Sequence, residues 1–203
     1  MRKVALVTAH RPVRSRALVV ALARAGYQVA LHPPGPAAWV REARRAVERI
    51  GGAPLRLVGA TGNGDGPVNR ALIAPGEHLG RLDVLVWGAG VGAGEELRGP
   101  IPTLVGALPP LAASGGALVP VLDAVPEVPV RDAFARMVGG LARTLAPGVR
   151  VNGVAPGGEA PASARGRRAA TLHGPPPRGE ADVARAVLFI LGAPWLNGEV
   201  VSA

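Results

Sequence analysis

The sequence predicts an α/β fold: a three-layer, doubly wound parallel sheet of about seven strands, formed by a single domain over residues 1–203. Short apolar, β-branched runs alternate with longer stretches of helical period, which is the pattern of βαβ units. The run VLVW at 84–87 is apolar throughout, as in strands that are buried on both faces. The 203 residues suffice for one sizeable core, and no change of composition marks a second domain.

The elements follow one another along the chain with recognisable local signals. Gly26 suits the left-handed residue that ends the first helix, and Pro36 suits the first turn of the second helix. Pro109 and Pro110 are expected to kink or end the fourth helix, because proline supplies no backbone donor. The strands are expected at 4–8, 27–32, 55–59, 82–90, 116–123, 149–156 and 198–202. The helices are expected at about 14–25, 36–50, 68–79, 102–114, 131–145 and 181–191.

The stretch 158–179, GEAPASARGRRAATLHGPPPRG, has no periodicity. Its small residues and prolines predict a mobile loop. Loops of this length in a compact domain are usually lids or binding segments. A disordered loop without a role is the alternative, and both interpretations stay open.

The formal net charge of +9 raises the hypothesis of a nucleic-acid partner, because arginine and lysine neutralise phosphates. The positive charge is nearly all arginine, spread along several predicted helices, and aromatic residues make up only 3% of the chain. Exposed bases stack on aromatic side chains, so such a composition disfavours single-stranded ligands. We therefore expect nucleic acid not to be the partner.

Several other chemistries are excluded or disfavoured by residue counts. The chain has no cysteine, which excludes disulfides, thiolate metal sites and a cysteine nucleophile. Its four histidines show no paired metal spacing, and its serines lack a GxSxG turn. No window reaches about 18 uninterrupted apolar residues, and the start of the chain carries no apolar signal core. We expect a cytoplasmic protein with no metal and no membrane span.

Three local sequences, in the correct order, resemble the short-chain dehydrogenase/reductase family. LDVLVWGAG at 82–90 resembles that family's LDVLVNNAG. LARTLAPGVRVNGVAPGG at 141–158 resembles LTRSLAPxGIRVNxVxPG, and the stretch 179–201 resembles the family's last helix and strand. The first segment is similar to pteridine-reductase-like and acyl-carrier-protein-reductase-like members. The resemblance implies a Rossmann-type fold, an oxidoreductase activity and a nicotinamide dinucleotide at the carboxyl ends of the strands.

The family's phosphate-binding turn reads TGxxxGxG, and its three glycines correspond here to Ala9, Val13 and Ser15. A β-branched residue such as Val13 cannot cheaply adopt a left-handed conformation, so the usual backbone cradle is in doubt. The same turn holds Arg11 and Arg14 at the positive end of a helix dipole, where a bound phosphate would offset their charge. Either these arginines point into solvent or, with Ser15, they bind a phosphate.

The remaining cofactor positions are implied by the resemblance. Family members that prefer NAD place an acidic residue after the second strand, where this chain has His32 followed by two prolines. Any nicotinamide cofactor is therefore expected to be NADP, and the alternative is that no cofactor binds. Asn152, Pro156 and Gly157 match family positions that shape the nicotinamide end of the pocket, and a structural role explains these three residues equally well. The other implied pocket positions are Gly88, Ala89 and Gly90.

The family's catalytic serine, tyrosine and lysine are all replaced. By alignment Arg131 stands at the tyrosine position, Ala135 at the lysine position and Asp123 near the serine position. Arginine keeps its proton at any working pH and cannot act as the acid or base. The chain has one tyrosine, Tyr27, and one lysine, Lys3, and the predicted fold places both away from the cleft. We assign no catalytic residue and expect an ion pair between Asp123 and Arg131.

Three hypotheses about function remain at this point. The first is a protein similar to short-chain dehydrogenases/reductases that has lost standard reductase catalysis and serves as a binding or assembly subunit. It would form a homo-oligomer, or a hetero-oligomer with a catalytic relative, because family members associate through their long helices and last strand. The second is an active NADPH-dependent oxidoreductase with unusual catalytic residues. The third is an anion- or nucleic-acid-binding module that uses the turn at 10–16 and the arginines at 165–168.

Overall fold

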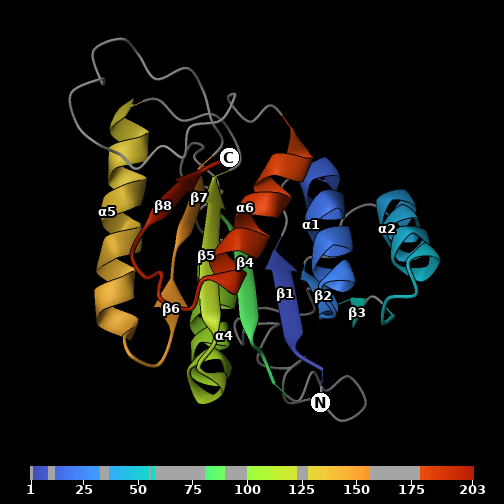
Figure 1. Ribbon diagram of the computed structural model, residues 1–203, viewed down its shortest axis with the longest axis horizontal. Helices are drawn as coiled ribbons and strands as arrows, with labels where there is room; N and C mark the ends of the chain where they lie inside the picture. The colour runs from blue at the N-terminus through green and yellow to red at the C-terminus, as the bar shows by residue number, and fades with distance from the viewer. Residues whose placement is uncertain are drawn as a thin grey trace.

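A parallel sheet lies between two layers of helices in the computed structural model (Figure 1). The structure describes residues 2–8, 12–32, 37–54, 56–57, 81–89, 100–122, 128–155 and 179–203. The strands are β1 Val4–Thr8, β2 Gln28–His32, β3 Arg56–Leu57, β4 Val84–Ala89, β5 Ala117–Leu122, β6 Arg150–Val151, β7 Gly153–Ala155 and β8 Val200–Ser202. The helices are α1 Pro12–Arg24, α2 Ala37–Arg49, α4 Pro100–Ser114, α5 Val128–Leu145 and α6 Glu180–Gly192.

The strand order is β3-β2-β1-β4-β5-β7-β8, and each pairing is parallel. The short β6 pairs with the amino-terminal part of β5, and β7 pairs with its carboxyl-terminal part. β6 and β7 are therefore two parts of the strand expected at 149–156, which is interrupted at Asn152. The predicted doubly wound parallel sheet of about seven strands is confirmed. The winding reverses between β1 and β4, which are neighbours although β2 and β3 lie between them in sequence.

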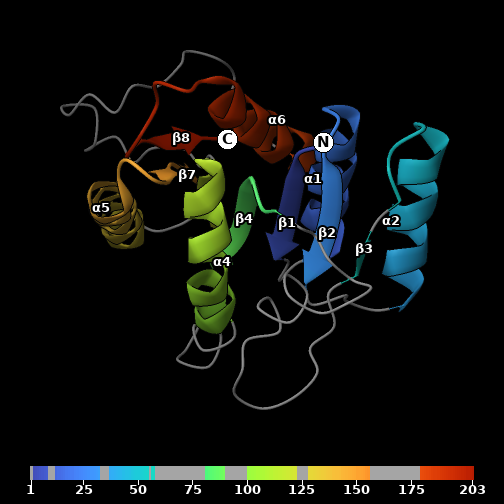
Figure 2. The same ribbon diagram turned by 90° about the horizontal axis from the view of Figure 1, so that it is seen from below.

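The core has two parts because successive side chains of a strand point to opposite faces of the sheet. Val7 of β1 and Val86 of β4 belong to the cluster that α1, α2 and α6 cover. Leu6 and Leu85, their chain neighbours, belong to the cluster covered by α4 and α5. Figure 2 shows α4 and α6 on opposite sides of the sheet.

Local backbone signals end the first two helices as expected. Gly26 follows α1 with φ of +87°, and Gly51 follows α2 with φ of +66°. Both conformations lie in the left-handed region, which a residue without Cβ adopts at little cost. α1 begins at Pro12, two residues before the expected start, and α5 begins at Val128, three residues before it.

Pro109 and Pro110, expected to kink or end their helix, do not end it, because α4 continues through both to Ser114. Because Pro109 has no N–H, the carbonyl of Val105 loses its intrahelical hydrogen bond. Val105 and Pro109 both lie on the exposed side of α4. Water can therefore satisfy that carbonyl. On the opposite side, Ala107 and Leu111 are fully buried and hold the helix against the sheet.

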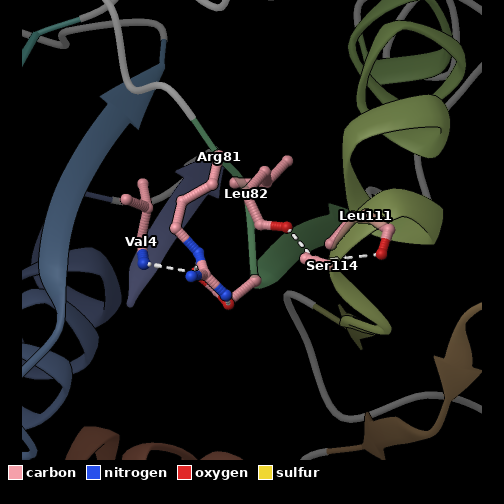
Figure 3. A network of polar contacts seen from close by, with 6 residues as sticks. Val4, Arg81, Leu82, Leu111 and Ser114 are labelled. Atoms are coloured by element: carbon pink, nitrogen blue, oxygen red, sulfur yellow. Dashed lines mark hydrogen bonds and ion pairs between the residues drawn. The ribbon is translucent and has the colours of Figure 1, made fainter. Parts of the chain in front are cut away.

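A network of polar contacts fastens the amino ends of the central strands (Figure 3). The carboxylate of Asp83, whose side chain is 8% exposed, accepts the backbone N–H of Val4 at 2.8 Å and Nε–H of Arg81 at 2.8 Å. A second guanidinium nitrogen of Arg81 bonds the other carboxylate oxygen. Next to it, the Ser114 hydroxyl lies 2.5 Å from the carbonyl of Leu82. These contacts join β1, β4 and the end of α4.

The helix expected at 68–79, the first-turn proline Pro36, and the loop at 158–179 except for its last residue lie outside the described ranges. Gly179 itself is described, and it stands immediately before α6. None of the helices in the described part of the chain is long and apolar enough to cross a membrane.

Candidate functional site at the carboxyl ends of β1 and β4

A crevice is expected where the winding of the sheet reverses, because the helices that follow β1 and β4 depart to opposite faces. In this chain that point lies between the carboxyl ends of β1 and β4. α1 begins at Pro12, four residues after Thr8 ends β1, so the N-terminus of α1 lies near the carboxyl ends of the strands (Figure 1). Proline suits the first helical position, where its missing N–H removes no intrahelical bond. The N-terminus of a helix is a favourable place for a phosphate.

Thr8 joins the two strands at the base of this site. Its Oγ1 accepts a hydrogen bond from the backbone N–H of Gly88 at 3.0 Å, and the same hydroxyl lies 3.5 Å from the carbonyl of Val86. The side chain is buried, so the bond holds β4 at the level where it leaves the sheet. Thr8 was not among the site residues expected from the sequence. The available signal was a polar residue at the end of an otherwise apolar strand.

Trp87 occupies the first position of the segment that resembles NNAG, but its indole lies in the core. Its side chain is 4% exposed and belongs to the cluster covered by α4 and α5, together with Leu85 on the same face of β4. The residue therefore packs on the sheet instead of offering a polar amide to a ligand.

His32 ends β2 and lies beside Thr8 in the register of β1 and β2. It is buried, and no carboxylate stands at this strand end within β2. Arg14 and Ser15 lie in the first turn of α1, and Ala89 is the last residue of β4. The candidate positions outside the described residues are Arg11, Gly90, Asp123, Pro156 and Gly157.

Arg131, at the position that the resemblance assigns to the catalytic tyrosine, lies in the first turns of α5 and makes a structural contact. Its guanidinium donates a hydrogen bond to Oγ of Ser202 in β8. Ala135, one turn further along α5, is exposed. The ion pair of Arg131 with Asp123 stays a prediction, because Asp123 lies outside the described residues.

Asn152 holds the connection between α6 and β8. Its Nδ2 donates to the carbonyl of Leu196 at 2.9 Å, and its Oδ1 accepts the backbone N–H of Glu199 at 3.1 Å. The residue is 1% exposed. Both ends of the amide are thus engaged with the backbone, which favours the structural explanation of this residue over a role toward a ligand.

The chain's single tyrosine and single lysine lie at the amino ends of the strands, opposite the candidate site. Lys3 precedes β1 and Tyr27 precedes β2, and the backbone N–H of Gln28 bonds the Lys3 carbonyl at 2.8 Å. Burial raises the pKa of Tyr27, the nearby Asp83 carboxylate raises it further, and Arg150 lowers it. The expectation that neither residue reaches the carboxyl ends of the strands is confirmed. Within the described ranges, no three histidine, aspartate or glutamate side chains gather as metal ligands would.

Solved structures match this chain over nearly its full length. A short-chain dehydrogenase/reductase from Mycobacterium marinum matches with a TM-score of 0.70 and 19% identity, over 98% of this chain and 92% of that one. The acetoin dehydrogenase of Salmonella typhimurium matches with a TM-score of 0.71 and 18% identity, over 100% and 95%. The chain has the fold of a short-chain dehydrogenase/reductase. A mutant short-chain dehydrogenase/reductase from Serratia marcescens matches with a TM-score of 0.71 and 23% identity, over 99% and 96%.

No protein-family model matches the sequence, and no curated protein matches it. The resemblance in the sequence motifs is nevertheless confirmed at the level of the fold. The chain covers more than nine tenths of each of these structures. At 18–23% identity this likeness shows the fold alone.

Proposed function

We propose that this chain is a member of the short-chain dehydrogenase/reductase family that does not carry out the standard reductase reaction and acts as a binding or assembly subunit. The observation that carries the proposal is the location of Tyr27 and Lys3 at the amino ends of the strands. Reduction of a carbonyl needs a proton donor within hydrogen-bond reach of the carbonyl oxygen. No substitution elsewhere in the chain supplies another tyrosine or lysine, because the sequence has one of each.

The described residues fit the framework of a dinucleotide site but not its usual phosphate cradle. The N-terminus of α1 opens beside the Thr8–Gly88 bond, where a pyrophosphate would be held. A nicotinamide cofactor bound there would supply a hydride. With no carboxylate at the end of β2, the cofactor that fits is NADP, held by Arg11, Arg14 and Ser15 in place of glycine amides. The opposing possibility is that the substituted turn binds no nucleotide.

Assembly is the second part of the proposed function, as a homo-oligomer or with a catalytic relative. Three large apolar side chains are exposed in the described part: Val105 at 60%, Phe189 at 48% and Trp195 at 79%. The backbone on both sides of Trp195 is anchored, because a guanidinium nitrogen of Arg150 donates to the carbonyls of Ala193 and Leu196, each at 3.1 Å. Tryptophan is enriched among the residues that contribute most to protein interfaces.

Calorimetric titration with NADPH and then NADH at low salt tests the binding part. Micromolar binding of NADPH that Arg14→Gln weakens would support phosphate capture by side chains, and Arg24→Gln at the other end of α1 is the matched control. Heat with neither nucleotide would limit the role to assembly. NADPH oxidation that depends on a carbonyl substrate would refute the proposed loss of reductase chemistry.

For the assembly part, sedimentation velocity should show association that Trp195→Ser weakens.

A further inference from the structure

α2 has a buried side and an opposite side that carries a row of arginines. Val40, Ala43 and Val47 are buried against α1 and the sheet. Facing away from them are Arg41, Arg45 and Arg49, which we call the arginine stripe, and each is exposed. Their spacing of four residues places the first and last Cα about 12 Å apart along the helix axis.

The charges of the stripe have no carboxylate partner among the described residues. The ion pairs found there join Arg16 to Glu42, Arg81 to Asp83 and Arg185 to Asp182. The stripe's own polar contact runs along the helix, from Nε of Arg49 to the carbonyl of Arg45 at 3.3 Å. Two charges of the same sign four residues apart destabilise a helix by about 0.2–0.5 kcal/mol per pair. A ligand with regularly repeated negative charges would remove this repulsion.

The charges next to the stripe leave it positive. Glu42 forms an ion pair with Arg16 of α1, with 3.6 Å between a guanidinium nitrogen and a carboxylate oxygen. Glu48 is the other acidic residue of α2, and Arg44 adds a fourth arginine. Figures 1 and 2 place α2 at the outer edge of the molecule, with no other described element over its outward side. The stripe is therefore accessible to a large anionic partner.

The chemistry of the helix favours the phosphate backbone of a nucleic-acid duplex. Guanidinium groups bind phosphate oxygens with two parallel hydrogen bonds, and a net charge of +9 attracts a polyanion from a distance. α2 has no asparagine or glutamine with which to read adenine edges, and arginines that engage phosphate oxygens carry no sequence information. The exposed positions described on α2 are arginine, glutamate and alanine, and none of these described positions offers a large apolar side chain to a bilayer.

We propose that the arginine stripe of α2 binds the phosphate backbone of duplex DNA without sequence preference. Along the sequence the arginines look dispersed over several helices, which disfavours a nucleic-acid partner. Within α2, however, three of them recur at every fourth position and lie in one row on the side that faces away from the core. This inference does not depend on the proposed function, because it uses neither the crevice nor the exposed tryptophan.

The test is fluorescence anisotropy with two labelled DNA duplexes of unrelated sequence, over a series of salt concentrations. Neutralising three phosphates predicts a slope of log K against log salt of about −2.7, which is about a 40-fold loss of affinity for a fourfold rise in salt. The variant Arg41→Gln/Arg45→Gln/Arg49→Gln should lose this slope and most of the binding. Glu48→Gln, which removes the carboxylate from α2, should tighten binding about two- to fivefold.

The matched control removes the same charge from exposed arginines on other helices, as Arg24→Gln/Arg136→Gln/Arg143→Gln. This control should keep the slope of the original chain. Equal losses in the two triple variants would mean diffuse attraction and overturn the proposal. The proposal also fails if low salt gives no binding, if one duplex is strongly preferred, or if the chain binds anionic vesicles or polyglutamate but not DNA. Thermal unfolding should show that both triple variants remain folded.

Discussion

Replacement of Asp83 with asparagine removes a buried negative charge at the amino ends of β1 and β4 while keeping the shape of the side chain. In the native chain the carboxylate accepts the backbone N–H of Val4 at 2.8 Å. A hydrogen bond to a charged group stabilises by about 1.5–3 kcal/mol, and one between neutral groups by about 0.5–1.5 kcal/mol. We therefore expect Asp83→Asn to lower the free energy of unfolding by about 1 kcal/mol from this bond alone.

Asp83→Ala provides the larger step of the same series. It leaves the buried N–H of Val4 without an acceptor, which costs about 1–3 kcal/mol. Arg81→Gln keeps the carboxylate and removes a partially exposed partner, so its effect should be the smallest of the three. Urea unfolding followed by tryptophan fluorescence gives the order. If Asp83→Ala proves no more destabilising than Arg81→Gln, the argument that Asp83 serves mainly the Val4 N–H is refuted.

The same asparagine variant has a second readout at Tyr27. Because the Asp83 carboxylate raises the pKa of Tyr27, its neutralisation should lower that pKa, although burial still keeps it above 10. The chain has one tyrosine, so the ultraviolet absorbance of tyrosinate reports this residue alone. With the pKa raised in the folded state, the folded chain binds more protons than the unfolded chain above pH 10. The contribution of Tyr27 to stability is therefore fully present below pH 10 and is lost as pH rises from there through the folded pKa.

Three further substitutions test the polar and steric contacts of the sheet. Thr8→Val should destabilise by about 1–3 kcal/mol in urea unfolding, because it leaves the Gly88 N–H without its acceptor. Asn152→Leu should cost at least as much in thermal unfolding, since it removes the bonds to Leu196 and Glu199; an unchanged midpoint would contradict the structural role. Gly153→Ala would place a Cβ 2.7 Å from a ring carbon of Phe134, and this overpacking should lower the free energy of unfolding by about 1–3 kcal/mol and with it the thermal midpoint. Gly192→Ala is the control, because its Cβ would meet nothing within 4 Å.

The parallel sheet could be predicted because its strands are buried on both faces and therefore read as apolar runs. The interruption at Asn152 could not, because it depends on contacts with Leu196 and Glu199, which are more than forty positions away. The continuation of α4 through Pro109 depends on which side of the helix the freed carbonyl faces. That orientation is decided by packing against the sheet and not by the local sequence.

At the site, some features were open to prediction and others were not. The side on which Trp87 lies follows from alternation along β4, because Leu85 shares its face and Val86 takes the other. The bond between Thr8 and Gly88 requires the register of β1 and β4, which the sequence does not contain. The contact of Arg131 with Ser202 joins α5 to the end of the chain and likewise depends on the assembled fold.

The sheet and the reaction residues of the resembled family are specified by different positions. The sheet depends on apolar strands that are buried on both faces and on buried polar contacts such as those of Asp83. At the position aligned with the catalytic tyrosine, Arg131 bonds the hydroxyl of Ser202 and so links α5 to the edge strand β8. Five donors on a long, planar group give arginine the reach for this contact. Arg131 thus has a structural partner in β8, so a tyrosine placed at this position would have to replace that contact before it could serve a reaction.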